Sequence, residues 1–234
     1  MTTVKLSERL KRLVDWIPQG SILADIGSDH AYLPTYAIQE GKIQKAIAGE
    51  VNPGPFESAL ATVRAMGYSQ QIQVRKGNGL EVLSKGEVQT IVIAGMGGVL
   101  IRSILDNGEA KLSHDTTLIL QPNNGEEPLR EWLDQHDWTI QKEIILEEDG
   151  HLYEAMVAQK SDEPRIRLTP DDLLFGPFLR REKNEFFIRK WNKELTKWKG
   201  ILMSVQNQAE ESDDKQTRLK EIKQLIKRME EAVE

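Results

Sequence analysis

The sequence predicts an α/β fold, in which a seven-stranded, mostly parallel sheet is followed by a C-terminal antiparallel helical hairpin. Between Ser21 and Lys160, short apolar runs alternate with helix-like segments, which is the order of a parallel sheet with crossover helices. After Pro164 the apolar residues recur at helical spacing instead. We therefore expect two domains, with residues 1–163 around the sheet and residues 164–234 forming a helical coiled-coil domain.

Five apolar runs are the expected parallel strands, because strands buried on both faces consist almost entirely of apolar residues. They cover residues 21–26, 46–51, 71–75, 90–94 and 116–121. Helical patterns begin at about residue 32 and cover residues 56–66, 100–107 and 129–136. Two more strands, 138–146 and 152–158, flank residues 147–151 (EEDGH), where Asp149-Gly150 accepts the positive φ of a tight turn. This hairpin completes the seven strands.

Both ends of the sequence carry amphipathic helical patterns. Residues 4–16 predict a surface helix that covers the sheet edge, and contact with an RNA backbone is the second interpretation of its cations. Near the C-terminus, two apolar series over residues 187–205 and 219–233 recur at steps of three and four. The polar run between them predicts that the two helices fold back on each other. We interpret the aromatic residues of the first series as packing residues rather than base-stacking platforms.

The composition is that of a soluble globular protein, with 39% hydrophobic and 29% charged residues. No apolar run reaches the ~18 residues of a membrane-spanning helix, and the N-terminus lacks the apolar core of a signal peptide. Cysteine is absent and the four histidines are scattered, so we expect no disulfide, no thiol nucleophile and no metal site. We expect a cytoplasmic monomer without membrane contact.

The net charge of −6 is unevenly distributed along the chain. Residues 1–164 carry a net charge of −9, residues 165–234 carry +3, and the segment 177–199 alone carries +5. A basic element on an acidic body attracts a polyanion. An ordinary solvated helix face is the alternative interpretation of this segment.

The sharpest motif, DIGSDHAYLP (residues 25–34), follows the first expected strand. Gly27 allows a tight turn and leaves room for a ligand against the main chain. Glu50 closes the second strand, 25 residues after Asp25. An acidic side chain there can accept hydrogen bonds from both ribose hydroxyls of an adenosine. The alternative interpretation of Glu50 is a solvent-exposed strand end.

Two further loops, 76–80 (KGNGL) and 94–98 (AGMGG), follow the third and fourth strands. A side-chain amide beside a glycine suits an adenine edge, although tight turns alone would also account for these glycines. Because the carboxyl ends of parallel strands meet at one rim, the loops together predict a nucleotide-like ligand there. The candidate cofactor-binding residues are Asp25, Gly27, Ser28, Glu50, Val51, Asn78, Gly79, Ala94, Gly95, Met96 and Gly97.

Asp29 distinguishes between two nucleotide-like ligands. A dinucleotide site places a pyrophosphate at a helix N-terminus, and a carboxylate at this position would repel it. S-adenosylmethionine has no phosphate and carries a cationic sulfonium and an amine, which a carboxylate stabilises. We therefore expect S-adenosylmethionine rather than NAD as the cofactor.

Three strings, DIGSDHAYLP (25–34), AGMGG (94–98) and QPN (121–123), resemble the bacterial tRNA adenine-22 N1-methyltransferases. The resemblance covers residues 1 to about 160, and the C-terminal hairpin is similar to that family's coiled-coil appendage. The first loop is less glycine-rich than in most class I methyltransferases and no Asn-Pro-Pro-Tyr loop is present, a departure that the family shares. The resemblance implies a Rossmann-like class I methyltransferase fold, with methyl transfer from S-adenosylmethionine to N1 of an adenine in the D-arm region of tRNA.

This reaction places positive charge on the adenine, so a carboxylate near the base would be stabilising. Asp29 is the candidate catalytic residue, and an N-cap of the following helix is its alternative role. The candidate substrate-base pocket comprises His30, Tyr32, Gln121, Pro122 and Asn123, with helix capping or loop packing as alternatives. The candidate tRNA contacts are Arg9, Arg180, Arg181, Lys183, Arg189, Lys190, Lys193 and Lys197.

Three other functions stay open at this point. One is methylation of another RNA or of a small molecule, for which the basic hairpin would be dispensable in the small-molecule case. The second is a non-catalytic RNA adaptor that binds the cofactor without turnover. The third is an NAD oxidoreductase, which would have no use for Asp29.

Overall fold

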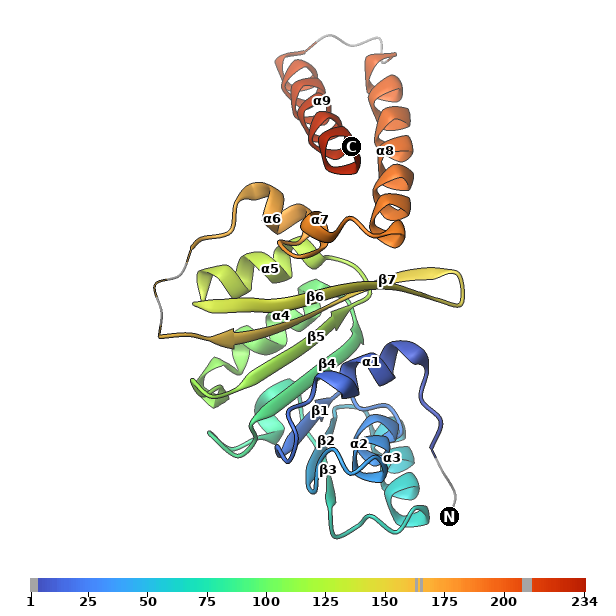
Figure 1. Cartoon of the computed structure of the whole chain (residues 1–234), viewed down its shortest axis with the longest axis vertical. Coiled ribbons are helices and arrows are strands. Elements are labelled where there is room, and N and C mark those ends of the chain that lie inside the picture. The colour runs from blue at the N-terminus through green and yellow to red at the C-terminus, as the bar shows by residue number, and fades with distance from the viewer. Residues whose placement is uncertain (1–3, 163, 165, 208–211) are drawn as a thin grey trace.

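The computed structural model describes residues 4–162, 164, 166–207 and 212–234. Within them lies a sheet of seven strands in the order β3-β2-β1-β4-β5-β7-β6 (Figure 1). The strands β1 to β5 pair in parallel, and β7 is antiparallel to both β5 and β6, which confirms the predicted fold class. The strands are β1 Leu23–Ile26, β2 Ala46–Glu50, β3 Ile72–Lys76, β4 Thr90–Met96, β5 Thr117–Pro122, β6 Trp138–Glu148 and β7 His151–Lys160.

Helices cover both faces of this sheet. One face packs against α1 (Glu8–Trp16), α2 (Tyr32–Gln39) and α3 (Pro53–Ala65). The other face packs against α4 (Gly98–Asn107), α5 (Glu126–Gln135) and the 3-10 turn η1 (Gly79–Val82), with η2 (Glu109–Lys111) at the end of α4. Neighbouring strand residues enter opposite clusters, because side chains alternate across a strand. On β4, for example, Val92 faces the first cluster and Ile93 the second.

The N-terminal helix α1 packs as predicted. Its Leu13 and Val14 are buried in the first cluster. Ser7 caps the helix, since its side chain accepts a hydrogen bond from the Leu10 amide at 3.4 Å. The helical spacing of the apolar residues in this segment therefore reflects their burial against the sheet.

The hairpin between β6 and β7 is tighter than the sequence predicted. Glu148 pairs with His151, so only Asp149 and Gly150 form the turn. Their φ angles are +50° and +76°, the pair of left-handed residues that matches the twist of the flanking strands. The two strands consequently extend over residues that the sequence assigned to the connection, and the longer hairpin projects past the end of β5 (Figure 1).

Four helices follow the sheet: α6 (Pro170–Phe175), α7 (Leu179–Glu182), α8 (Glu185–Gln206) and α9 (Asp213–Val233). Thr169 caps α6 and Pro170 occupies its first position. The long helices α8 and α9 lie side by side in opposite directions and extend away from the sheet (Figure 1). We call this pair the helical hairpin.

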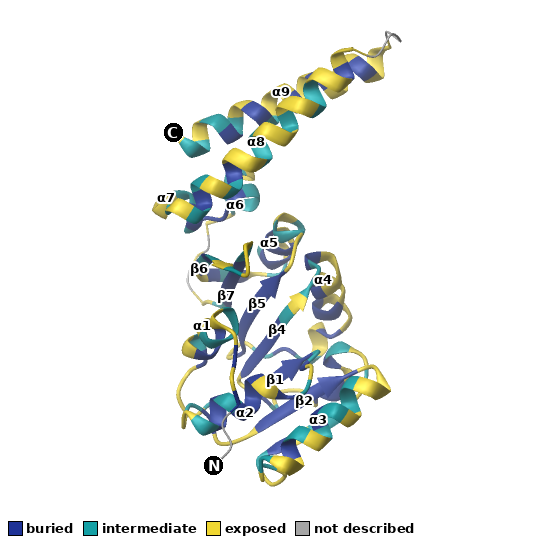
Figure 2. Cartoon of the chain, turned by 90° about the vertical axis from the view of Figure 1, so that its right-hand side faces the viewer, coloured by how far each residue is buried: buried dark blue, intermediate teal, exposed yellow. Residues whose placement is uncertain are grey.

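The helical hairpin is held together by the apolar series that the sequence contains. Val205 packs with Leu219, Ile222 and Ile226, and the buried residues line the facing sides of the two helices (Figure 2). Near the sheet, Phe187 and Trp191 join a cluster with Phe175 and Met229. These aromatic side chains are therefore packing residues. No described helix is both long and apolar enough to cross a membrane.

Candidate functional site

The loops that the sequence singled out meet at one rim of the sheet. In parallel strands the carboxyl ends share one edge, and the order β2-β1-β4-β5 places the ends of these four strands side by side. Ile26, Glu50, Met96 and Pro122 are the last residues of these strands. The rim therefore gathers the expected cofactor loops and the expected base pocket.

The loop after β1 is strained. Asp29, His30 and Ala31 are three successive non-glycine residues with positive φ angles of 36°, 66° and 55°. Such residues cost on the order of 1–3 kcal/mol each and persist only where the surroundings fix them. Here the Glu50 carboxylate accepts a hydrogen bond from the Asp29 amide at 2.6 Å. The Asp29 side chain is 80% exposed above the rim.

Capping does not explain Asp29. The N-cap position of α2 is Ala31, and no side chain caps that helix end. The Asp29 carboxylate instead lies 3.4 Å from the His30 imidazole. His30 in turn stacks on Tyr32, with ring centroids 5.1 Å apart and nearly parallel planes. An exposed carboxylate beside two stacked rings is an arrangement that can receive a base.

Two buried carboxylates lie beneath this loop. Asp25 is 4% exposed and accepts a hydrogen bond from the Ser28 hydroxyl. Burial raises the pKa of Asp25 to about 7, partly offset by the Ser28 hydrogen bond. Burial also raises the pKa of Glu50. Glu50 is 5% exposed, so it is not the solvent-exposed strand end of the alternative interpretation. Two buried acids with no Lys or Arg partner among the described residues favour a cationic ligand at this point.

The glycines of the rim serve different purposes. Gly27 has φ +70°, and a Cβ there would overlap the end of the Met96 side chain. Gly95 has φ +76° and open space above it. Gly98, in contrast, lies against the Gly125 main chain, and its amide donates to the Asn124 carbonyl at 2.7 Å. The AGMGG loop is therefore clamped to the loop between β5 and α5, and only part of it is open to a ligand.

The remaining cofactor candidates lie at the edge of the rim. Val51 is 52% exposed immediately after Glu50. Asn78 is exposed after β3, and its backbone amide donates to Glu81 at 3.2 Å. Gly79 has φ +53° and packs against Ile104, so its freedom is used for chain packing. Together Val51 and Asn78 present an apolar and a polar group on the open side of β2 and β3.

The expectation for Gln121 and Pro122 requires correction. Gln121 is completely buried, and its side-chain oxygen accepts hydrogen bonds from Arg9 and from the Gly95 amide. Its side-chain nitrogen donates to the Pro122 carbonyl at 2.8 Å. Both ends of the side-chain amide are thus occupied by protein groups, because the loops around it need internal hydrogen bonds. Of these three residues only Asn123 is exposed, with its side-chain amide donating to the Gly95 carbonyl at 2.7 Å.

Arg9 also has a different surrounding from the expected one. Its guanidinium binds Glu148 at 3.2 Å, hydrogen-bonds to Gln121 and lies 4.7 Å from the centre of the Tyr153 ring. The side chain is 17% exposed. It connects α1 to the end of β5 and to the β6–β7 hairpin, so its contacts stabilise this part of the rim.

The predicted tRNA-contact residues of the helical part fall into two groups. Several have carboxylate partners: Arg180 with Asp171 and Asp172, Arg189 with Glu147, Lys190 with Glu126 and Glu154, and Lys197 with Glu194. Arg181, Lys183 and Lys193 are exposed and have no ion pair among the described residues. The sequence could not distinguish the two groups, since half of the partners, Glu126, Glu147 and Glu154, are distant along the chain.

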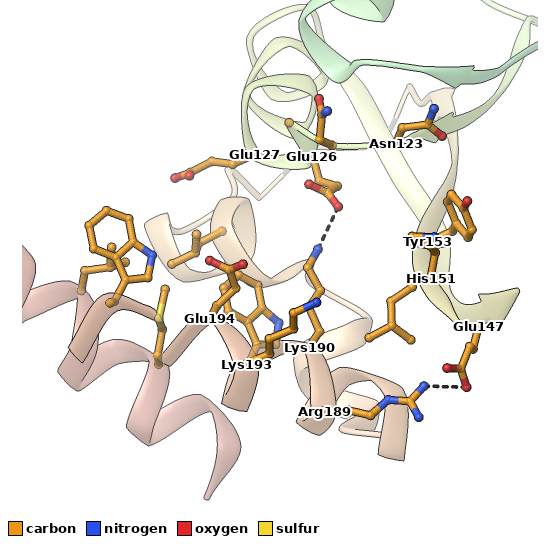
Figure 3. A pocket seen from close by; sticks show the side chains of 18 of the residues that line it. Asn123, Glu126, Glu127, Glu147, His151, Tyr153, Arg189, Lys190, Lys193 and Glu194 are labelled. Atoms are coloured by element: carbon orange, nitrogen blue, oxygen red, sulfur yellow. Dashed lines mark hydrogen bonds and ion pairs between the residues drawn. The ribbon is translucent and has the colours of Figure 1, made fainter. Parts of the chain in front are cut away.

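A groove of about 910 Å³ separates the rim from the helical hairpin. Asn123 and the start of α5 form one wall, Tyr153 and His151 of β7 another, and α8 the third (Figure 3). Lys190 and Lys193 point into it from α8, and Glu126 faces Lys190 (Figure 3). The sequence did not identify His151 and Tyr153 as groove residues, because the residues of a strand do not show which part of the chain the strand will face. No cluster of potential metal ligands occurs in the described part of the chain.

The chain is similar in sequence to a family of tRNA methyltransferases. The family model of TrmK, tRNA (adenine(22)-N(1))-methyltransferase, matches residues 23–231. The tRNA (adenine(22)-N(1))-methyltransferase of Bacillus subtilis is 45% identical over 98% of this chain and 96% of its own length.

Two solved structures extend this similarity to three dimensions. The crystal structure of the B. subtilis m1A22 tRNA methyltransferase TrmK superposes with a TM-score of 0.93 at 43% identity, covering 99% of this chain and 100% of that one. A putative tRNA (m1A22) methyltransferase of Streptococcus pneumoniae, solved in complex with S-adenosyl-L-methionine, has a TM-score of 0.88 at 40% identity and covers 98% and 100%. The chain described here belongs to the TrmK family of tRNA (adenine(22)-N(1))-methyltransferases.

Proposed function

We propose that this chain transfers a methyl group from S-adenosylmethionine to N1 of adenine 22 in the D-arm region of tRNA. Membership of the TrmK family supports the reaction and its substrate. The observation that carries the local assignment is the Asp29 carboxylate, which a strained loop holds exposed at the rim. It lies beside the stacked His30 and Tyr32 rings and above two buried carboxylates.

The rim fits a cationic nucleoside. Asp25 and Glu50 are buried acids without a Lys or Arg partner in the described part of the chain, which suits the cationic S-adenosylmethionine and disfavours a pyrophosphate. Glu50, at the end of β2, is the proposed acceptor for the ribose hydroxyls of the cofactor. We assign Val51 and Asn78, which are exposed after β2 and β3, and Ala94, Gly95, Met96 and Gly97, at the end of β4, to the adenosine part of the cofactor. When bound, this cofactor supplies the electrophilic methyl group.

Asp29 acts on the acceptor base in this mechanism. N1 of adenine has a lone pair and needs no deprotonation, so the protein must position the base and stabilise the positive charge that develops on it. The exposed Asp29 carboxylate accepts a hydrogen bond from the N6 amino group and offsets that charge. His30 and Tyr32 offer a flat surface against the base, and Asn123 lies across the rim from them.

N1 is on the pairing edge, so the base must leave any pair before it reaches the rim. The tRNA body then needs contacts away from the site, and we propose residues 164–234 as the domain that provides them, with residues 1–163 as the methyltransferase domain. Arg181, Lys183 and Lys193 carry exposed charge that no described carboxylate neutralises. Arg189 and Lys197 are also exposed but already paired, so they add less.

The decisive experiment is transfer of labelled methyl from S-adenosylmethionine to an unmodified tRNA transcript with adenine at position 22. A matched transcript with guanine at position 22 is the control. Labelling of the adenine transcript alone is the expected result. Labelling of both would move the target to another nucleotide, and binding of the cofactor without labelling of either would favour the adaptor function.

The exposed cations are tested by the salt dependence of tRNA binding. Neutralising Arg181, Lys183 and Lys193 together should weaken binding and reduce the slope of log K against log salt by about 0.7–0.9 for each phosphate that is no longer neutralised. A filter-binding titration over a range of salt concentrations measures this slope. The same slope in variant and parent would show that these cations do not bind the RNA.

A further inference from the structure

A cluster of five charged side chains lies between the sheet and the helical hairpin. It consists of Glu126 and Arg130 on α5, Glu143 on β6, Glu154 on β7 and Lys190 on α8. Arg130 binds Glu143 at 2.8 Å and Glu154 at 2.5 Å, and neither Arg130 nor Glu143 has an exposed side chain. Lys190 reaches the other oxygen of Glu154 at 2.7 Å and Glu126 at 2.8 Å. The Glu154 carboxylate thus joins a cation of the sheet layer to a cation of the hairpin.

The same cluster holds the segment that leads to the hairpin. Arg130 donates to the Leu173 carbonyl at 3.2 Å, and Glu143 accepts from the Phe178 amide at 2.9 Å. Between them, Gly176 lies so close to Arg130 and Glu143 that a Cβ would have to displace them. Side chains of the sheet layer therefore grip α6, α7 and α8 together.

The charges of this cluster favour one orientation of α8 over others. Burial alone would raise the pKa of Glu154, but Lys190 and Arg130 outweigh it and lower that pKa, so the carboxylate is ionised. Buried ion pairs add little net stability compared with apolar packing, while breaking one leaves a buried charge and is costly. An arrangement in which Lys190 leaves its two carboxylates is therefore disfavoured, and this selects one orientation of α8.

Lys190 is also linked to the rim. Glu126 is the first residue of α5 and directly follows Gly125, whose main chain packs against Gly98. The neighbouring Asn123 side-chain amide bonds to the Gly95 carbonyl at 2.7 Å. Contacts thus run from Lys190 of α8 through Glu126 to the loop between β5 and α5 and on to the AGMGG loop. Lys190, Glu126 and Asn123 of this path are visible in Figure 3.

We propose that Lys190 is a positioning residue, which orients the helical hairpin so that a tRNA held by it presents its target base to Asp29. This inference rests on the proposed function. It replaces the direct phosphate contact that the sequence suggested for Lys190, because the Lys190 ammonium is shared between Glu126 and Glu154 and the side chain is only 21% exposed.

The first test compares Lys190→Met with Glu126→Gln. A phosphate contact and a positioning role of Lys190 predict different effects of the second substitution on kcat and on tRNA binding. Lys190→Met should lower kcat at saturating tRNA on the order of tenfold to a hundredfold, as expected for misplaced reactants. Glu126→Gln should lower kcat in the same direction, and the double variant should be no worse than Lys190→Met, since both act through one interaction. If Lys190 bound phosphate, removal of the Glu126 charge would improve tRNA binding and leave kcat intact, which would overturn the proposal.

Two lysines of the same helix are comparison variants. Lys199 pairs with Glu230 of α9 at 2.7 Å but lies outside the cluster, so Lys199→Met should leave kcat within about twofold, the scale of an exposed ion pair. Lys193→Met removes an exposed cation and should act on the KM for tRNA. A loss of kcat in Lys199→Met equal to that in Lys190→Met would show a general weakening of the hairpin and refute the specific role.

A second measurement needs no activity and is therefore independent of the proposed function. The chain contains no cysteine, so Glu57→Cys on α3 and Lys220→Cys on α9 provide two unique sites for spin labels. The distribution of distances between the labels should broaden in Lys190→Met and in Glu126→Gln and stay narrow in Lys199→Met. An unchanged distribution in Lys190→Met would overturn the proposal even if methylation were abolished.

Discussion

At the rim of the sheet, three successive non-glycine residues hold positive φ angles, whereas α8 and α9 keep a regular helical backbone throughout their described residues. The rim leaves Asp29 exposed and buries the acids Asp25 and Glu50. The helical hairpin buries a series of apolar side chains and pairs several of its surface charges. The rim therefore costs stability that packing elsewhere supplies, which is the distribution expected of a site prepared for a ligand.

The largest difference between the two regions should appear on replacing Asp29. Asp29→Asn keeps the size of the side chain and a residue type that tolerates positive φ, but removes the charge. We expect the methylation rate to fall on the order of a hundredfold, the scale of a single electrostatic contribution at a reacting centre, while the dissociation constant for S-adenosylmethionine changes little. Single-turnover kinetics and calorimetry measure the two quantities. A full rate in this variant would remove Asp29 from the mechanism.

The close approach of the two rim loops should be the next most sensitive feature. Gly98→Ala forces a Cβ against the Gly125 main chain, and neither backbone can yield without moving a loop. We expect a decrease of about 1–3 kcal/mol in the free energy of unfolding, as for other overpacked positions, together with lower activity. Denaturant titration measures the stability. Wild-type stability would mean that the loops separate easily.

The buried carboxylates should make the rim sensitive to pH. Burial raises the pKa of Asp25 to about 7 from 3.8. Between these two pH values the folded state keeps a proton on Asp25 that the unfolded chain has lost. The stabilisation of the folded state by this proton is fully present below pH 3.8 and is lost as the pH rises through about 7. Asp25→Asn should therefore gain stability relative to the parent as the pH rises from 3.8 to about 7, by at most about 1.4 kcal/mol per unit of pKa shift. Thermal melts at several pH values test this, and parallel curves for the two proteins would contradict it.

The smallest effect should lie in the hairpin and have the opposite sign to that of Gly98. Gly200 occupies the interior of α8 with open space around it. Gly200→Ala should raise the free energy of unfolding by about 0.5–1 kcal/mol, because alanine loses less backbone entropy in a helix. Denaturant titration beside the parent protein measures this gain. A destabilised variant would show that this face of α8 has no room for a methyl group.

The periodic features of this protein could be predicted from its residues alone. The alternation of apolar runs and helical segments predicted the seven strands, and the steps of three and four predicted the packing of α8 against α9. The residues DIGSDHAYLP and AGMGG predicted the rim, because glycine and acidic residues directly after parallel strands are typical of a nucleotide-binding edge. These features are local, so their signal lies in neighbouring residues.

The contacts of the polar side chains, in contrast, became known from the folded chain. The sequence predicted that the Gln121 amide binds the base, yet its side-chain oxygen accepts hydrogen bonds from Arg9 and from the Gly95 amide. Lys190 reads as one more cation of a basic helix, yet it lies between carboxylates that are 36 and 64 residues away along the chain. Hydrogen bonds and ion pairs depend on distances that the fold alone sets, and periodicity carries no information about partners so far apart.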